Sequence, residues 1–138
     1  MQNKQYNLVV IGAGAAGVFA AIHACANLPP KSVLVLEKSL HPLSKVKISG
    51  GGRCNVTHSC FDTTQLVKNY PRGSKELRGP FSFFQPLHTI EWFQERGVML
   101  KTESDGRMFP VTDNSQTIID CLLKAAGNVE ISYGKNVV

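Results

Sequence analysis

The segment YNLVVIGAGAAG at residues 6–17 constrains the fold more than any other part of the sequence. A short apolar run ends in three glycines spaced G-x-G-x-x-G, which are Gly12, Gly14 and Gly17. This spacing predicts a strand that turns sharply into a helix. Gly12 would permit the turn, Gly14 would leave room for a pyrophosphate, and Gly17 would let the helix pack closely on the strand.

The following residues extend this turn into a βαβ unit. An Ala-rich pattern over 15–27 predicts a helix that ends before Pro29, and the apolar run at 32–38 predicts a second buried strand. The helix start, with Ala15 and Ala16, would offer free N–H groups to phosphates. Such a unit is typical of an α/β, Rossmann-like FAD/NAD(P)-binding domain with a parallel core.

An acidic residue stands where a ribose would be bound. Glu37 closes the second predicted strand, 20 residues after Gly17, and with its neighbour Lys38 it joins the candidate cofactor-binding residues. An acid at this place favours an unphosphorylated ribose, as in FAD or NAD, and the glycine motif does not separate these two cofactors. The alternative is a turn that merely tolerates glycine.

Further elements follow along the chain. Residues 39–62 lack periodicity, which is typical of a functional or disordered loop. We predict a helix at 85–97, a hairpin at 98–111 that turns at 104–106, a helix at 112–127 capped by Asp113, and a strand at 129–138. The aromatic-rich stretch 79–93 suits a core-facing helix stripe, or a surface that packs on another domain.

Composition excludes several classes of protein. Hydrophobic residues make up 43% of the chain and charged residues 18%, which is an ordinary globular balance. The sequence has no apolar run long enough to span a membrane and no secretory signal pattern, so we expect a cytoplasmic protein without membrane partners. The net charge of +5 comes from scattered basic residues. This charge suits solubility or an affinity for anions such as nucleotide phosphates, and without a dense basic tract or an RNA-binding motif we expect no specific nucleic-acid partner.

The four cysteines and four histidines form no metal-binding pattern, so we predict no metal. Cys54 has no second cysteine at the spacing of a redox dyad, and we interpret it as a packing residue. His41, His58 and His88 are the only candidate proton carriers, whereas His23 belongs to the first predicted helix. No nucleophile or acid–base pair is evident, so catalytic residues stay unknown.

Two stretches, KISGGGRCNVTH at 47–58 and DGRMFPVTDNSQTIIDCL at 105–122, resemble the HI0933-like family of NAD(P)/FAD-dependent flavoprotein oxidoreductases. The resemblance implies FAD in the first of two dinucleotide-binding domains, and a backbone contact from Val137 to the adenine. It also implies that FAD is lined by Lys45, Ser49, Gly50, Gly51, Gly52, Arg53, Cys54 and Asn55. The sequence departs from the family at Leu43 and Ser44, just before Lys45, and at His58.

Family members are several hundred residues long, so the resemblance makes residues 1–138 a single, partial FAD-binding domain with 39–62 as its glycine-rich cofactor loop. It implies the FAD-binding portion of a flavin-dependent oxidoreductase that transfers hydride through FAD, with NAD(P)H as the electron donor. A truncated, non-catalytic flavin- or dinucleotide-binding module is the alternative, and a plain NAD-binding domain is a third. An incomplete sheet would also leave an open edge that favours self-association.

Overall fold

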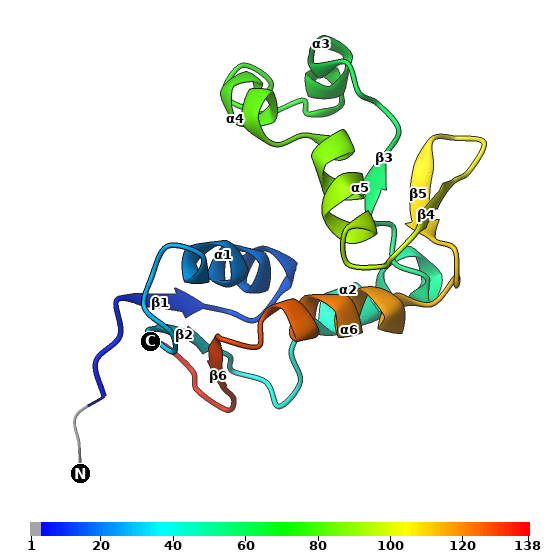
Figure 1. Ribbon diagram of the computed structural model, residues 1–138. Helices are drawn as coiled ribbons and strands as arrows, with labels where there is room; N and C mark the ends of the chain where they lie inside the picture. The colour runs from blue at the N-terminus through cyan, green and yellow to red at the C-terminus, as the bar shows by residue number, and fades with distance from the viewer. Residues whose placement is uncertain (1–3) are drawn as a thin grey trace.

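The computed structural model describes residues 4–138. Its elements, in chain order, are β1 (Leu8–Ile11), α1 (Ala15–Cys25), β2 (Val33–Leu36), α2 (Ser44–Ile48), the 3₁₀ turn η1 (Ser49–Gly52), β3 (Thr57–His58), α3 (Thr63–Leu66), the 3₁₀ turn η2 (Val67–Asn69), α4 (Arg78–Phe83), α5 (Pro86–Gln94), β4 (Leu100–Thr102), β5 (Arg107–Pro110), α6 (Ser115–Ala125) and β6 (Glu130–Ser132). They form two neighbouring groups, one around β1, β2 and β6 and one around β3, β4 and β5 (Figure 1).

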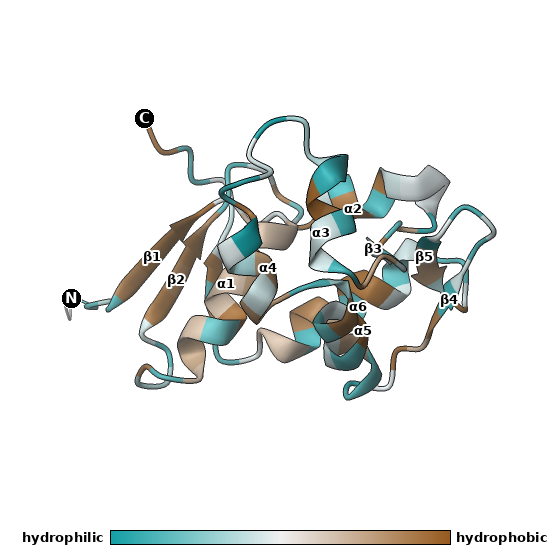
Figure 2. Ribbon diagram, turned by 90° about the horizontal axis from the view of Figure 1, so that it is seen from above, coloured by the Kyte–Doolittle hydropathy of each residue, from teal (hydrophilic) through white to brown (hydrophobic). Residues whose placement is uncertain are grey.

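The first group is built on a parallel sheet with the order β1-β2-β6. Leu8 pairs with Val33 and Ile11 with Leu36, while Val35 pairs with Ile131 on the other side of β2. β1 and β2 are hydrophobic along their whole length and run side by side in the same direction (Figure 2). The α/β fold class with a parallel βαβ core, predicted from the glycine turn, is therefore confirmed.

Helix α1 covers one face of this sheet (Figure 1). Val18 and Ala21 of α1 and Val33 and Val35 of β2 are all fully buried where the two elements meet. The alternate residues of β1 face away from this core, and Val9 is 48% exposed and Ile11 69% exposed. The sheet thus has one covered face and one that is open over β1.

The second group packs helices beside a small antiparallel sheet with the order β3-β5-β4. The β4–β5 hairpin turns where the sequence predicts, and Gly106 in the turn has a φ of +85°. α5 begins with Pro86, as predicted, and ends at Gln94, and Gly97 in the turn that follows has a φ of +78°. The N–H groups of Gly97 and Val98 donate to the carbonyls of Gln94 and Phe93, which is a Schellman ending.

Three local predictions are wrong. Asn114, not Asp113, caps α6, because the Asn114 side chain accepts from the Gln116 N–H at 2.9 Å. Asp113 adopts a φ of +50°, and its carboxylate forms ion pairs with Lys101 and Arg53. The strand predicted at 129–138 is ladder-paired only over Glu130–Ser132. The segment 39–62, expected to lack secondary structure, contains α2, η1 and β3.

Among residues 4–138, no helix has both the length and the apolar character needed to cross a lipid bilayer.

Candidate cofactor site

The turn between β1 and α1 has the geometry that its glycine spacing predicts. Gly12 has a φ of +95°, which favours glycine, and its N–H donates to the Leu36 carbonyl at 2.7 Å. Gly14 precedes the first turn of α1, and no side chain caps this helix start. The first N–H groups of α1 are therefore left for solvent or a ligand, at the positive end of the helix dipole.

Gly14 and Gly17 are required for different reasons. A Cβ atom on Gly17 would lie 2.0 Å from the Gly12 oxygen and 3.3 Å from Cγ1 of Val10, so the close packing of helix on strand needs glycine. A Cβ atom on Gly14 would meet no other described atom within 4 Å. The space beside Gly14 is open, which fits the approach of a dinucleotide pyrophosphate to the backbone.

Glu37 directly follows β2. Its carboxylate connects the segment after β1 with the segment after β2. One carboxylate oxygen accepts from the Ala13 N–H at 2.7 Å, and the other accepts from the N–H and the hydroxyl of Ser39, both at 2.8 Å. Hydrogen bonds from the Ser39 N–H, the Ala13 N–H and the Ser39 hydroxyl hold the pKa of this carboxyl below its ordinary value of 4.5. Glu37 is ionised at neutral pH, and its remaining lone pairs could accept ribose hydroxyls.

The glycine loop after α2 is a compact turn. Residues 50–52 have φ values of +56°, +67° and +86°. A Cβ atom on Gly50 would lie 2.8 Å from the Asn55 backbone nitrogen and 2.8 Å from Cε1 of Phe109, so the loop folds back against β5 without room for a side chain. Glycine is needed here for both conformation and space.

Two hydrogen bonds hold α2, the helix before this loop, one to the glycine turn and one to the start of α6. The Leu43 N–H donates to the Ala13 carbonyl at 2.8 Å, and Leu43 itself is buried with a φ of +56°. The Ser115 hydroxyl donates to the Lys47 carbonyl at 2.8 Å. α2 is thereby fixed between the start of α1 and the start of α6, and Figure 1 shows α2 directly beside α6.

Between these segments lies an open pocket of about 550 Å³, which we call the α1–α6 pocket. Seven of the predicted cofactor-binding residues line it, from the glycine turn and from the region 45–55. They are Gly14, Ala15, Ala16, Lys45, Ser49, Cys54 and Asn55. Sequence analysis missed the apolar part of its wall, which includes Phe19, Val46, Phe84, Phe93, Ile118 and Leu122. The aromatic residues at 84 and 93 belong to the stretch 79–93, whose helical spacing was the available signal.

The other predicted residues lie outside this pocket wall. Gly12 and Gly17 shape the turn, Glu37 and Lys38 follow β2, and residues 50–52 form the adjoining loop. Val137 lies in the tail after β6 and is 46% exposed. That tail runs along the end of β2, because the N–H groups of Gly134 and Lys135 donate to the carbonyls of Ser39 at 3.2 Å and Glu37 at 2.8 Å.

The Arg53 side chain is engaged by other protein groups. Its guanidinium bonds to Glu103, lies 3.5 Å from a carboxylate oxygen of Asp113, and stacks over the Phe109 ring at 4.0 Å from the centroid. These partners come from the β4–β5 hairpin and the segment after it. Arg53 thus joins the glycine loop to the hairpin.

The candidate proton carriers and the loop cysteine occupy separate environments. His58 Nε2 lies 3.0 Å from the Asp105 carbonyl, His88 Nδ1 accepts from the Gln85 N–H at 3.0 Å, and His41 is exposed. Burial raises the pKa of the Cys54 thiol, which is 6% exposed. No group of three or more His, Cys, Asp or Glu residues in the described chain could hold a metal ion.

Comparisons with known proteins support the Rossmann-like fold of this chain. A family model described as the HI0933-like protein Rossmann domain matches residues 6–137. The crystal structure of THI4 from Thermovibrio ammonificans is similar in fold, with a TM-score of 0.54 over 94% of this chain and 38% of that one, at 14% sequence identity.

Two curated relatives are also similar in sequence. A ribosomal RNA dihydrouridine synthase from Escherichia coli (strain K12) is 29% identical over 98% of this chain and 33% of its own length. A 3-dehydro-bile acid delta(4,6)-reductase from Clostridium scindens is 27% identical over 82% of this chain and 27% of its own length. The chain spans about a third or less of either relative. Because the family model covers nearly all of it, the chain belongs to the family defined by the HI0933-like Rossmann domain.

Proposed function

We propose that this chain is the FAD-binding portion of a flavin-dependent oxidoreductase. The α1–α6 pocket carries the proposal, because it joins the uncapped start of α1 at Gly14 to Lys45 and Ser49 of the glycine loop region. The α1 N–H groups and the Lys45 ammonium would bind the pyrophosphate, and Glu37 would accept the ribose hydroxyls. The backbone near Val137 would meet the adenine.

The rest of the pocket suits a large flat ring. Its aromatic and aliphatic wall, with Phe19, Phe84 and Phe93, would shield an isoalloxazine from water, while Asn55 and the glycine-loop amides would face its polar edge. Bound FAD would supply hydride transfer, with NAD(P)H as the expected electron donor in a longer enzyme. One relative is named a reductase, which is the reaction class that this chemistry serves. We expect such a protein in the cytoplasm.

A non-catalytic flavin- or dinucleotide-binding module is the second candidate. The observation that favours it is that none of the candidate proton carriers His41, His58 and His88 lines the α1–α6 pocket. In that case FAD would bind without turnover, and the same residues would hold it.

A titration of the purified chain with FAD, followed by absorbance and flavin fluorescence, tests the proposal. We expect saturable binding that is abolished in Gly14→Val and weakened in Glu37→Ala, and we expect NAD⁺ to compete poorly. Arg96→Gln, two residues beyond the end of α5 and outside the α1–α6 pocket wall, is the control and should bind FAD normally. Absence of FAD binding by a chain whose circular dichroism shows an intact fold would overturn the proposal.

A further inference from the structure

A second pocket adjoins the α1–α6 pocket. It has a volume of about 360 Å³ and lies among β3, the α3–η2 segment, α4 and α5, and we call it the α3–α5 pocket. Asn55, Val56, Phe84 and Thr89 line both pockets. The two pockets are therefore neighbours, and these four residues form the wall between a molecule in one pocket and a molecule in the other.

The α3–α5 pocket differs from its neighbour in chemistry. Thr57, Thr89 and Gln85 bring two hydroxyls and an amide to its wall, so it offers both donors and acceptors. Tyr70 and Phe81 supply aromatic faces, with ring centroids 5.5 Å apart and an interplanar angle of 51°. Flat rings that also form hydrogen bonds match such a wall, whereas a purely apolar molecule would leave its polar groups without partners.

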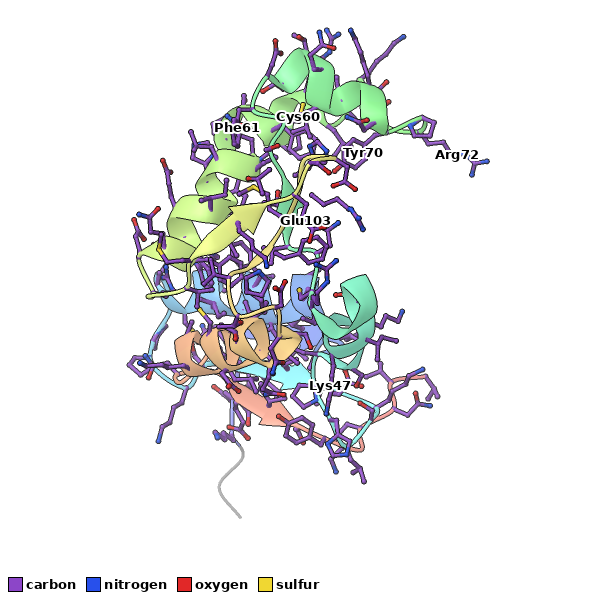
Figure 3. All side chains as sticks on the ribbon, turned by 90° about the vertical axis from the view of Figure 1, so that its right-hand side faces the viewer. Lys47, Cys60, Phe61, Tyr70, Arg72 and Glu103 are labelled. Atoms are coloured by element: carbon purple, nitrogen blue, oxygen red, sulfur yellow. The ribbon has the colours of Figure 1, made fainter. Side chains whose placement is uncertain are left out.

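The segment that supplies Tyr70 and Phe81 is also basic. It carries four exposed cations, Lys68, Arg72, Lys75 and Arg78, and none of them forms an ion pair with any residue of 4–138. Within 68–78 the one acidic residue is Glu76, and the carboxylate of Asp62, which precedes this segment, caps α3. In Figure 3, Tyr70 points back toward the body of the protein while Arg72 projects away from the ribbon. The approach to the pocket therefore favours anions.

We propose that the α3–α5 pocket binds the planar heterocycle of an anionic nucleotide, with its phosphate directed toward the basic segment 68–78. This inference rests on the proposed function, because it makes the nucleotide the second reactant beside an FAD held in the α1–α6 pocket. The aromatic faces would stack on the ring, and the amide and hydroxyls would pair with its polar edge. A nicotinamide dinucleotide and a nucleotide within a single RNA strand share this chemistry.

The test uses the full chain saturated with FAD and four probes, which are nicotinamide mononucleotide, NADH, uridine monophosphate and a short oligouridylate. Binding is followed by NMR chemical shifts of the backbone amides. We expect saturable shifts at Tyr70, Phe81 and Thr89 with at least one probe, and an affinity that falls as salt is raised. The nicotinamide arms and the uridine arms distinguish the two sources of the ligand.

Variants assign the binding to this pocket. Tyr70→Ala should weaken it by about fivefold or more, whereas Tyr70→Phe should retain most of the affinity because the stacking face remains. Phe61→Ala is the matched control, since Phe61 is an exposed aromatic of the same region outside the pocket wall. Arg72→Gln with Arg78→Gln should weaken binding and reduce its salt dependence, while Lys124→Gln on α6 should not.

The outcomes separate the two proposals. If FAD binds but no probe shifts these amides at millimolar concentration, the inference is wrong and the proposed function stands. Equal binding by the wild type and Tyr70→Ala would also overturn the inference. If FAD does not bind, the proposed function fails, and the same titration of the FAD-free chain still decides whether the α3–α5 pocket takes a nucleotide ring.

Discussion

A Cβ atom on Gly17 would stand 2.0 Å from the carbonyl oxygen of Gly12. The contact is with backbone, so α1 or the end of β1 would have to move to relieve it. We expect Gly17→Ala to lower the free energy of unfolding by about 2 kcal/mol, because overpacking costs more than the improved helix propensity returns. Urea denaturation followed by circular dichroism measures this change.

Gly14→Ala is the matched comparison. Its Cβ meets no other described atom within 4 Å, and Gly14 has a φ of −80° that alanine adopts easily. We expect stability within about 0.5 kcal/mol of the wild type but weaker binding of FAD, since the methyl group would occupy the open space beside the helix start. Equal destabilisation by both alanines would contradict these separate roles.

We expect Glu37 to make the stability of the folded chain depend on pH. Its pKa is lowered in the folded chain by Ser39 and Ala13, so the ionised carboxylate contributes stability above its ordinary pKa of 4.5. This contribution is lost as pH falls below that value toward the lowered pKa of the folded state. Glu37→Gln keeps the shape but removes the charge, and should flatten the fall of melting temperature between neutral and acidic pH.

The melting temperatures of the wild type and Glu37→Gln, measured across that pH range, provide the check. Asp62 and Asp105 also have lowered pKa values in the folded chain, and they should leave a residual slope in the variant. Parallel curves for the two proteins would mean that the Ala13 and Ser39 hydrogen bonds do not stabilise the fold. At neutral pH the variant should also bind FAD more weakly, because one ribose acceptor is lost.

We expect the ion pair between Arg53 and Glu103 to couple the glycine loop to the β4–β5 hairpin. Their side chains are about one-third exposed and bonded to each other, and Figure 3 shows Glu103 between the α3–α4 region and the α2 region. We expect Arg53→Met and Glu103→Gln each to weaken FAD binding through disorder of the loop. The double variant should lose less than the sum of the two losses. Additive losses would show that the two residues act independently.

The sequence predicted the parts of this molecule that local chemistry determines. A strand followed by Gly12, Gly14 and Gly17 leaves few options other than a βαβ turn, and the positive φ of Gly12 and the close contact of Gly17 follow from it. The hairpin turn at Gly106 and the Pro86 start of α5 are equally local. These features need no knowledge of distant residues.

Features that depend on distant contacts were missed. The apolar wall of the α1–α6 pocket joins Phe19 to Ile118 and Leu122, which are about a hundred residues apart in the chain. Asp113 was predicted as a helix cap because its type and position suit one, yet ion pairing with Lys101 and Arg53 takes its carboxylate. The short elements α3, η2 and α4 have too few turns to show a helical period.

We expect the thiol of Cys54 to react slowly. It is buried, and burial raises the pKa of its thiol, so little thiolate forms near neutral pH. Cys60, which follows β3, is partly exposed. Brief treatment of the native chain with iodoacetamide, followed by peptide mass spectrometry, should label Cys60 and leave Cys54 unmodified until the chain is unfolded. Equal labelling of both thiols would support a redox role for Cys54 instead.

We expect two copies of this chain to associate through β1, which is an edge strand of its sheet. β1 pairs with β2 on one side, and Val9 and Ile11 expose apolar side chains on the uncovered face. An unpaired edge of this kind is a template for another strand, so two copies would pair through β1 or bury this face. We expect the average mass measured by sedimentation velocity to rise with concentration.

Val9→Lys should shift this equilibrium toward the monomer, because a charged side chain resists burial at the edge. Val9 does not line the α1–α6 pocket, so we expect the Val9→Lys variant to bind FAD as the wild type does. Leu40→Lys is the matched control, since Leu40 is 74% exposed but lies in the segment after β2 rather than on the sheet edge. If both lysine variants associate as the wild type does, the contact lies elsewhere; if only Val9→Lys becomes monomeric, β1 forms the interface.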